Sequence, residues 1–434
     1  MIERFKRYFG YGFWVALETI LFMGLPQLVV FPLAARIVGQ AAFGQFVFCL
    51  GIVMVIGSAP SMGLFTGIYR ELARLEPARQ ELLVQTGLGL CKLALAVVVG
   101  VGLAAVAVYR IFIGAEPGIA ACLIPLLAFL YFLNVFQMHL VRYRVERRFA
   151  VRTAWFAILA ALQFAGLLGA WLGQKFGYGT IGLCWGYLAA HAVGYVWLTR
   201  QQGISLGRNP FDADLARLLK TVWLYDSVAN LLLMSGRNIY RILLGLTHSY
   251  SDVSVLFGAT SVLNCCMAPL TILSSLLLSM LSGFASLHEV GRRQRRTVLS
   301  AGIVIAIAGP IVTYLFAEPL MAMLFPEFAA DSATLLKKMV WVLPLEVMIS
   351  FTKPFVTKFA PIRVIPLLNG AVLLGHLLPS LLLVPRYGLT GVLISYYCGY
   401  AIASGCWLAV LVWLFRQRKP EPVPVVETPL ISQD

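Results

Sequence analysis

The chain has 434 residues, of which 60% are hydrophobic and only 12% are charged, and its formal net charge is +15. A soluble domain carries about 25% charged and about 45–50% apolar residues, so this composition excludes a soluble globular protein. Apolar residues occur in blocks of about 20, the length of a membrane-spanning helix. The alternating strands of about ten residues that indicate an outer-membrane barrel are absent. The predicted fold class is therefore an all-α polytopic membrane protein.

Twelve membrane-spanning helices are predicted from these apolar blocks. The ninth block can continue to Phe325, because Glu318 and Pro319 interrupt only its end. The basic and then apolar N-terminus is like a signal peptide, but its apolar run is too long, so we interpret it as an uncleaved first helix. The expected spans are roughly 9–33, 44–66, 82–109, 118–140, 153–173, 179–199, 221–245, 253–281, 298–316, 339–358, 364–384 and 389–415.

The cationic residues test this division, since Lys and Arg in short loops stay on the cytoplasmic side of a membrane. With the N-terminus placed inside, 25 of the 34 cations fall in inside connections or tails and six in outside connections. The other three, Lys92, Arg237 and Arg241, fall inside spans. This bias predicts an even number of spans with both termini in the cytoplasm. It also accounts for the net charge, so no nucleic-acid partner is expected.

The cysteine pattern indicates neither a disulfide framework nor a metal centre. All eight cysteines lie in apolar runs without the spacing of a metal site, and Cys265 and Cys266 are adjacent. They are interpreted as small hydrophobic residues.

A ten-residue phrase occurs twice, 209 residues apart. Tyr178–Tyr187 reads YGTIGLCWGY and Tyr387–Tyr396 reads YGLTGVLISY, and each opens an apolar block. Self-similarity at this spacing predicts two parallel six-span halves, although short Gly-rich turns also recur by chance. The glycines of each Tyr-Gly-x-x-Gly phrase are expected to let spans six and twelve approach neighbouring helices closely.

Four parts of the chain are predicted from this duplication. Residues 1–200 form an N-terminal lobe with spans one to six, and residues 221–416 a C-terminal lobe with spans seven to twelve. Residues 201–220 form a cytoplasmic linker, in which apolar residues at helical spacing predict a short amphipathic helix on the membrane surface. Residues 417–434 contain four prolines and are expected to be a disordered cytoplasmic tail.

Span seven carries ionisable residues that are costly in lipid and commonly face an interior cavity. Asp226, Asn230, Arg237 and Arg241 follow one another at intervals of 4, 7 and 4 residues, which places them within about 60° of one helix face. In one interpretation Arg36, Arg241 and Asp226 extend to the headgroups from helix ends. In the other interpretation, Arg237 and Arg241 line a central cavity and hold a phosphate-bearing ligand, because the guanidinium fork matches phosphate oxygens.

Spans one, three and ten carry further charges. In span one Glu18 and Arg36 are 18 residues apart, which equals five turns of an ideal helix and places them on one face. Pro26 and Pro32 intervene, so this helix is expected to be kinked, with its faces shifted. Glu346 and Lys353 of span ten are two turns apart and could be a structural pair; Lys92 lies in span three. The candidate substrate-binding cations of a central cavity are Arg36, Lys92, Arg237, Arg241 and Lys353. Glu18, Asp226 and Glu346 could bind a coupling ion or balance charge. The single histidines His139, His191 and His376 are expected to be ordinary packing residues.

Together these features resemble a known transporter family. The two six-span halves, the polar first helix, the stretch Arg-Ile-Val-Gly-x-x-x-Phe-Gly from Arg36 to Gly44 and the repeated Tyr-Gly-x-x-Gly are similar to Wzx-type polysaccharide flippases. That family belongs to the multidrug/oligosaccharidyl-lipid/polysaccharide (MOP) exporter superfamily, with the MATE drug antiporters and MurJ-type lipid II flippases. The resemblance covers residues 1–416 approximately.

The resemblance implies a V-shaped transporter of the bacterial inner membrane with a cationic cavity between two lobes. Its implied substrate is an undecaprenyl-diphosphate-linked oligosaccharide for O-antigen or exopolysaccharide synthesis, moved from the cytoplasmic to the periplasmic leaflet by alternating access. An H⁺ or Na⁺ gradient would drive it, without another cofactor. Membrane lipids, a polysaccharide polymerase and assembly proteins are the implied partners. The family's functional positions on helices one and seven correspond here to Glu18, Arg36, Asp226, Arg237 and Arg241.

Two departures and two rival functions bear on this expectation. Span one lacks a central arginine, and the two additional C-terminal spans of lipid II flippases are missing, which favours the Wzx type. A MATE-like drug antiporter is expected to carry few cavity cations, so Lys92, Arg237 and Arg241 argue against it. A membrane enzyme should show a long outer loop or a His/Asp/Glu cluster. The longest outer connection, Ala317–Lys338, contains no histidine, so no enzyme is expected.

Overall fold

The computed structural model describes residues 13–14, 16–72, 75–112, 117–145, 148–202, 210–281, 292–361 and 363–416. Within these ranges the chain is almost wholly helical and contains no strand, as the composition predicts. The expected tail at 417–434 lies outside the described residues.

The first span is a helix with a loosely wound middle. Residues 16–19 are α-helical and lead into two π-helical turns, η1 (Ile20–Gly24) and η2 (Pro26–Val30). The helix then continues as α2 (Phe31–Val38) and ends at Gly39, whose φ of 83° suits a residue without a side chain. The irregularity predicted from the prolines is thus present as π turns beside Pro26, which has no N–H for the helical ladder.

The other helices are long, and most bounds agree with the expected spans to within several residues. In the first half they are α3 (Gln40–Leu72), α4 (Pro77–Phe112), α5 (Pro117–Val145), α6 (Phe149–Lys175) and α7 (Gly179–Gln201). In the second half they are α8 (Ala213–Thr247), α9 (Tyr250–Leu281), α10 (Arg292–Leu324), η4 (Pro326–Phe328), α11 (Ala329–Met339), η5 (Val340–Val342), α12 (Leu343–Phe359) and α13 (Val364–Arg416).

Helix α13 contains two membrane crossings. Its 53 residues would extend about 80 Å as one helix, far more than the hydrocarbon core of about 30 Å. It breaks at Gly388, where φ is 53° and ψ is −128°, and a side chain at Gly375 would meet Ile402. The two arms therefore fold back on each other as an antiparallel hairpin.

Ten segments of the described chain are long and apolar enough to cross a membrane. Helix α13 counts once among them, and α8 is left out although its 35 residues are ample for a crossing. The charged residues of α8 lower its hydropathy. When α8 is added and α13 is divided at Gly388, the twelve predicted spans are accounted for.

Two sequence predictions differ from the structure. The expected outer connection Ala317–Lys338 is mostly helical, because α10 runs to Leu324 and α11 follows after η4. The amphipathic helix expected within 201–220 is continuous with span seven, as the first part of α8. Asp212 caps it by accepting hydrogen bonds from the backbone N–H groups of Asp214 and Leu215 at 2.8 and 3.0 Å.

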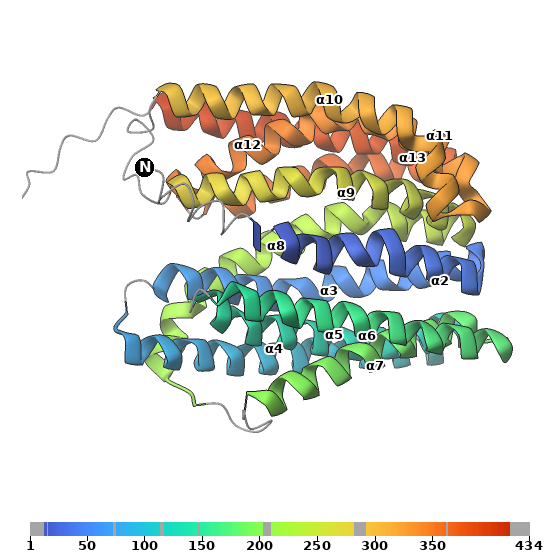
Figure 1. Ribbon diagram of the computed structural model, residues 1–434, viewed down its shortest axis with the longest axis horizontal. Coiled ribbons are helices and arrows are strands. Elements are labelled where there is room, and N and C mark those ends of the chain that lie inside the picture. Colours follow the sequence, from blue (N-terminus) through green and yellow to red (C-terminus); the bar gives the residue numbers. More distant parts are fainter. Residues whose placement is uncertain are drawn as a thin grey trace, which may run out of the picture.

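The helices lie side by side in two groups (Figure 1). Helices α3 to α7 form one group and α9 to α13 the other, while α8 packs against both α3 and α13. We call the end that holds the α3–α4, α5–α6 and α7–α8 connections the basic end, on the left in Figure 1. The opposite end holds the turns at Gly39, Gly177 and Gly388, all with positive φ.

The repeated phrase opens the second arm of a hairpin in each half. A methyl group on Gly182 of α7 would lie 2.9 Å from the Cα of Gly173 on α6 and nearer still to the carbonyl oxygen of Gly169. In α13, a methyl group on Gly391 would overlap the backbone of Leu383. The close helix approach expected of these glycines is therefore present in both hairpins.

The outward faces of the bundle are apolar, as lipid contact requires. Leu93, Val101 and Ile111 of α4 are 65%, 65% and 73% exposed, and Leu315 of α10 is 66% exposed. Patches of this kind on consecutive helices favour a hydrocarbon surrounding.

Candidate functional site

The candidate site lies where charged side chains of α8 and α12 are within electrostatic range of one another. The positive charge of Arg237 on α8 lies within electrostatic range of both Glu346 and Lys353 of α12. Both helices pack along α13, which brings these groups together. The side chains of Arg237 and Lys353 are exposed and that of Glu346 is half-buried, so the charged groups are open to solvent in the protein alone. We call Arg237, Glu346 and Lys353 the charged cluster.

An aromatic and histidine shell from α8 and α13 adjoins the charged cluster. Tyr240 hydrogen bonds to Nδ1 of His376 and donates to the carbonyl oxygen of Ser395 at 3.2 Å. The hydroxyl groups of Tyr396 and Tyr400 are 3.4 Å apart. The charge of Arg237 acts on His376, Tyr396 and Tyr400, so this shell lies within the electrostatic range of the arginine.

Two glycines, which have no side chain, leave the space that the His376 ring occupies. A methyl group on Gly399 would overlap the imidazole ring, and one on Gly236 would lie 3.4 Å from its Cδ2 atom. His376 is 7% exposed, in keeping with the expectation that this histidine is packed. It joins α8 to both arms of α13 and so helps to hold Arg237 in place.

Arg241 is placed apart from the charged cluster, towards α9. Its guanidinium group donates to Asn238 Oδ1 at 3.4 Å and to Thr260 Oγ1 at 3.3 Å, and it lies 5.1 Å from the centre of the Phe257 ring. Its charge also acts on Tyr396. Arg241 therefore lies within electrostatic range of the same aromatic shell while it supports the α8–α9 contact.

Two other cations named from the sequence lie elsewhere. Arg36 is exposed and donates to the carbonyl oxygen of Met323 in the last turn of α10, where a cation complements the helix dipole. Lys92 is half-buried on α4, and its charge acts on His139 of α5. Arg36 thus bonds to α10, and Lys92 lies within electrostatic range of α5.

Glu18 has a cationic partner that the sequence did not suggest. Its carboxylate accepts a hydrogen bond from Arg152 of α6 at 2.8 Å, and the guanidinium group lies 5.3 Å from the Phe156 ring. Glu18 and Arg36 do not share a helix face as proposed from their spacing. Two π turns lie between them, and a π turn holds more residues than an α turn, so 18 residues no longer complete whole turns.

Asp226 and Asn230, near the start of span seven, belong to the part of α8 that packs against α3. Asp226 is 7% exposed, and the Asn230 side chain donates to the carbonyl oxygen of Asp226 at 2.7 Å. A methyl group on Gly63 of α3 would lie 2.5 Å from the carbonyl oxygen of Trp223. Asp226 is thus buried next to the close approach of α8 to α3.

The aromatic and histidine shell was not predicted from the sequence, although the 209-residue repeat relates its tyrosines to ring side chains of the first half. The offset of 209 residues relates Tyr187 to Tyr396 and His191 to Tyr400. In the first half, His191 bonds to Gln163 at 3.3 Å and lies against Tyr187, with ring centres 5.7 Å apart. The same positions of the two hairpins therefore carry paired ring side chains.

Several contacts join the first span and α3 to the second helix group at the opposite end. Ser254 of α9 donates to the carbonyl oxygen of Gln40 at 2.6 Å, and the Gln40 side chain donates to the carbonyl oxygen of Ser251 at 3.3 Å. The Phe31 and Phe257 rings meet at 5.2 Å. With the Arg36 bond, these contacts join the first span and α3 to α9 and α10 at that end.

Among the described residues, no group of three or more His, Cys, Asp or Glu side chains could hold a metal ion.

Comparisons with known proteins identify the fold. No family model matches the chain, and no curated protein matches it. Solved structures do match over nearly the whole length. An inward-facing multidrug resistance MATE family transporter of the MOP superfamily is 14% identical, with a TM-score of 0.68, over 93% of this chain and 96% of the other.

Two further structures place a flippase and a transporter of another kind on the same fold. The lipid II flippase MurJ in an inward closed conformation is 11% identical, with a TM-score of 0.63, over 94% of this chain and 87% of the other. A MOP superfamily transporter from Pyrococcus furiosus, described by the reverse polarity of its binding pocket, is 12% identical, with a TM-score of 0.62, over 94% and 96%. The predicted MATE-like fold is confirmed.

Proposed function

We propose that this multi-pass membrane protein, which has the fold of MOP-superfamily transporters, is a flippase for an undecaprenyl-diphosphate-linked oligosaccharide. It would carry the lipid-linked glycan from the cytoplasmic to the periplasmic leaflet of the bacterial inner membrane by alternating access. The glycan would then pass to a polysaccharide polymerase and other assembly proteins. The fold supports transport, and the charged cluster supports an anionic substrate.

The excess of cations in the charged cluster is the observation that carries this proposal. Arg237 and Lys353 together carry two positive charges against the one negative charge of Glu346. A diphosphate group suits such a site, because guanidinium and ammonium groups both donate charge-assisted hydrogen bonds to phosphate oxygens. Arg241, close to Tyr396, adds positive potential from the α9 side.

Alternating access is supported by the contacts that join the helix groups at the opposite end. Hydrogen bonds and ring contacts join the groups at the opposite end. A transporter open at the basic end needs such a seal at the other end. The seal would have to break, and a new one form, for the substrate to leave.

Of the acids expected to couple an ion, Glu346 fits the role best. Glu18 is engaged by Arg152, and Asp226 is buried in the contact between α3 and α8. Glu346 lies within electrostatic range of both cations of the charged cluster. A proton or sodium ion on Glu346 would alter the field that the diphosphate meets, which links ion binding to substrate binding.

A MATE-like, cation-coupled drug antiporter is the alternative, and the fold supports it equally well. Glu346 is the observation in its favour, since its negatively charged carboxylate would attract a cationic drug. The two functions predict opposite substrate charges, so one reconstituted preparation can separate them.

The test uses the full-length protein in sealed vesicles. A fluorescent undecaprenyl-diphosphate-linked sugar is added, and its movement is followed with a membrane-impermeant quencher. We expect quenching to exceed that of protein-free vesicles and to be lost with Arg237→Ala. A second set of vesicles is loaded with a cationic dye under a proton or sodium gradient. Gradient-driven dye export without lipid movement would establish the antiporter and overturn the flippase proposal.

A further inference from the structure

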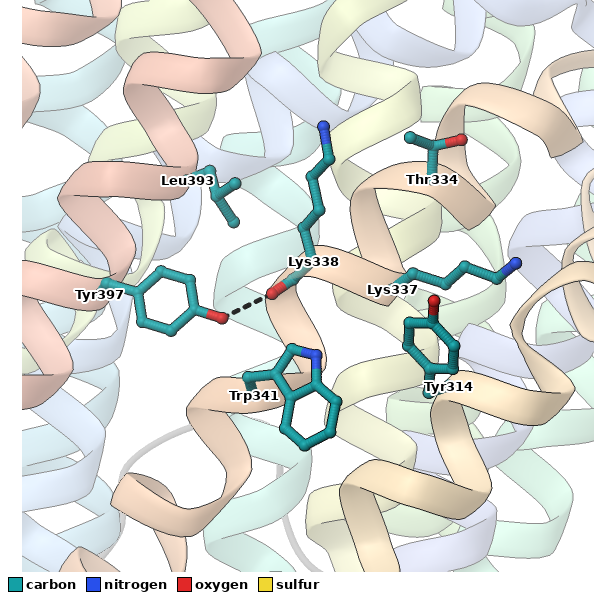
Figure 2. Close-up of a pocket in the computed structure, with 7 residues that line it drawn as sticks. All are labelled: Tyr314, Thr334, Lys337, Lys338, Trp341, Leu393 and Tyr397. Atoms are coloured by element: carbon teal, nitrogen blue, oxygen red, sulfur yellow. Dashed lines mark hydrogen bonds between the residues drawn. The ribbon is translucent and has the colours of Figure 1, made fainter.

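A groove lies outside the charged cluster, at the opposite end of the second helix group. It has a volume of about 490 Å³ and is bounded by α10, α11, η5 and α13. Figure 2 shows the rings of Tyr397, Trp341 and Tyr314 in a row, with the side chains of Lys337, Lys338 and Thr334 beside them. The groove therefore combines aromatic and cationic side chains. Its lining residues are Tyr314, Thr334, Lys337, Lys338, Trp341, Leu393 and Tyr397.

The aromatic wall is held in position by specific contacts. The Tyr397 hydroxyl donates to the carbonyl oxygen of Lys338 at 2.6 Å, which fixes the end of α11 to α13 (Figure 2). The Tyr314 and Trp341 rings lie 6.2 Å apart. Tyr314 is 41% exposed and Trp341 is 51% exposed, so both rings offer area to a ligand.

The two lysines differ in their charge balance. Lys337 donates to Glu318 at 2.5 Å and lies 5.4 Å from the centre of the Tyr314 ring. Among the described residues, no acidic side chain forms an ion pair with Lys338, whose side chain is exposed. The groove thus carries one cation whose charge is not balanced by a neighbouring acid.

The depth of the groove matches the boundary between headgroups and acyl chains. Tyr314 lies about one helical turn before Glu318, and Trp341 follows Lys337 and Lys338, so charged residues occur in the chain beside both rings. Trp and Tyr are enriched at this level of a bilayer, and lysine side chains extend from it to the phosphate layer. A ligand here needs an anionic head at Lys338 and an apolar part against Trp341 and Leu393.

We propose that this groove binds one anionic phospholipid of the surrounding bilayer, with its headgroup phosphate at Lys338 and its glycerol and first acyl carbons against Trp341. The inference does not rest on the proposed flippase function. Trp341 belongs to η5, directly before the helix that carries Glu346 and Lys353. A phospholipid held here therefore contacts the segment that leads into the charged cluster.

The test is lipid retention by the full-length protein in detergent, measured by native mass spectrometry. Phosphatidylglycerol is compared with zwitterionic phosphatidylcholine of the same acyl chains. We expect Lys338→Gln to lower the preference for phosphatidylglycerol about fivefold, the factor for about 1 kcal/mol per lysine at an anionic surface. Lys338→Arg should keep the preference, which also shows that the groove tolerates substitution.

Lys175→Gln is the matched control. Lys175 ends α6 at the opposite end and lies 3.7 Å from the centre of the Trp171 ring, outside the groove. Its variant should bind phosphatidylglycerol as the unaltered protein does. An equal loss in both variants, or no loss in Lys338→Gln, overturns the proposal. Competition by inorganic phosphate or undecaprenyl phosphate, but not by phosphatidylglycerol, would overturn the assignment to a phospholipid.

Discussion

Glu18 and Arg152, 134 residues apart in sequence, form an ion pair of 2.8 Å between the first span and α6. The two side chains are only 10% and 14% exposed. Breaking a buried ion pair by removing one partner costs about 3–5 kcal/mol. We expect Glu18→Gln to lower the apparent melting temperature of the purified protein strongly. Thermal unfolding in detergent, followed by tryptophan fluorescence, measures this.

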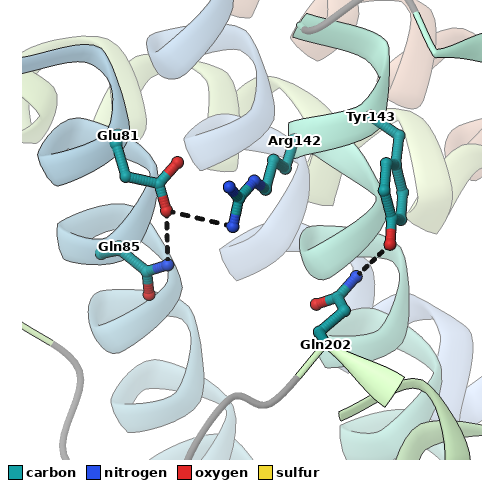
Figure 3. Close-up of polar contacts among 5 residues, drawn as sticks. All are labelled: Glu81, Gln85, Arg142, Tyr143 and Gln202. Carbon is teal, nitrogen blue, oxygen red and sulfur yellow. Dashed lines mark hydrogen bonds and ion pairs between the residues drawn. The ribbon is translucent and has the colours of Figure 1, made fainter. Parts of the chain in front are cut away.

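The Glu81–Arg142 pair of α4 and α5 is the control, because its side chains are 45% and 40% exposed (Figure 3). At 3.4 Å and in contact with solvent, that pair should contribute about 1 kcal/mol or less. Glu81→Gln should therefore change the melting temperature little. Equal changes in melting temperature would show that the Glu18–Arg152 pair stabilises the protein no more than the exposed pair does.

The close approach of α6 and α7 gives a second prediction. Gly182→Ala should destabilise the protein by about 1–3 kcal/mol, because the added methyl group overlaps the backbone of Gly169 and Gly173. Gly100→Ala on α4 is the matched change, since no atom lies within 4 Å of the added methyl group. It should be neutral or stabilise the protein by up to about 1 kcal/mol. A neutral Gly182→Ala variant in the same unfolding assay would contradict the observed packing.

The sequence predicted those features that follow from local chemistry. Hydropathy placed the spans, and the repeated glycines indicated close hairpins. Pro26 marked the irregular part of the first helix. Each of these depends on residues near one another in the chain, or on a property that a whole span shares.

The partners of the charged residues could not be predicted in the same way. Arg152 was counted as a loop cation, and nothing near it in sequence points to Glu18. The shared face of Glu18 and Arg36 assumed an α-helix throughout, which η1 and η2 replace. The grouping of Arg237 with Lys353 depends on how α8 and α12 pack on α13. The 209-residue offset could have indicated the aromatic shell, because it relates Tyr187 to Tyr396.

The Tyr240 hydroxyl supports His376 and provides a third prediction. Tyr240→Phe removes its hydrogen bonds to the imidazole ring and to the carbonyl oxygen of Ser395. Loss of a donor to buried acceptors costs about 1–3 kcal/mol. Tyr387→Phe, at a ring that is 58% exposed, should have no effect. If both variants unfold at the temperature of the unaltered protein, the hydroxyl of Tyr240 does not stabilise the shell.

The bond from Arg36 to Met323 tests the seal at the opposite end. Arg36→Ala should loosen the contact of α2 with α10 and expose the start of α9 more often. Hydrogen–deuterium exchange in residues 250–258 should then rise about fivefold, for a loss of about 1 kcal/mol. Arg110→Ala removes an exposed cation from the last turn of α4 and should leave this exchange unchanged. Unchanged exchange in Arg36→Ala would show that other contacts suffice for the seal.

Arg237 gives the prediction closest to the proposed function. A charge-assisted hydrogen bond contributes about 1.5–3 kcal/mol, so Arg237→Ala should weaken binding of undecaprenyl diphosphate about 10- to 100-fold. Arg237→Lys should lose less, because the charge remains while the guanidinium fork is lost. Binding is measured by displacement of a fluorescent undecaprenyl-diphosphate probe from the protein in nanodiscs.

The control for Arg237 lies on the same helix. The Arg217 side chain is 82% exposed and pairs with Asp214 in the first turns of α8, away from the charged cluster. Arg217→Ala removes the same charge from the same helix, so it should bind the probe normally. Full-strength binding by Arg237→Ala would contradict a diphosphate site at the charged cluster. Equal weakening by both variants would assign the effect to the overall field of the basic end, because only a local contact distinguishes two arginines of one helix.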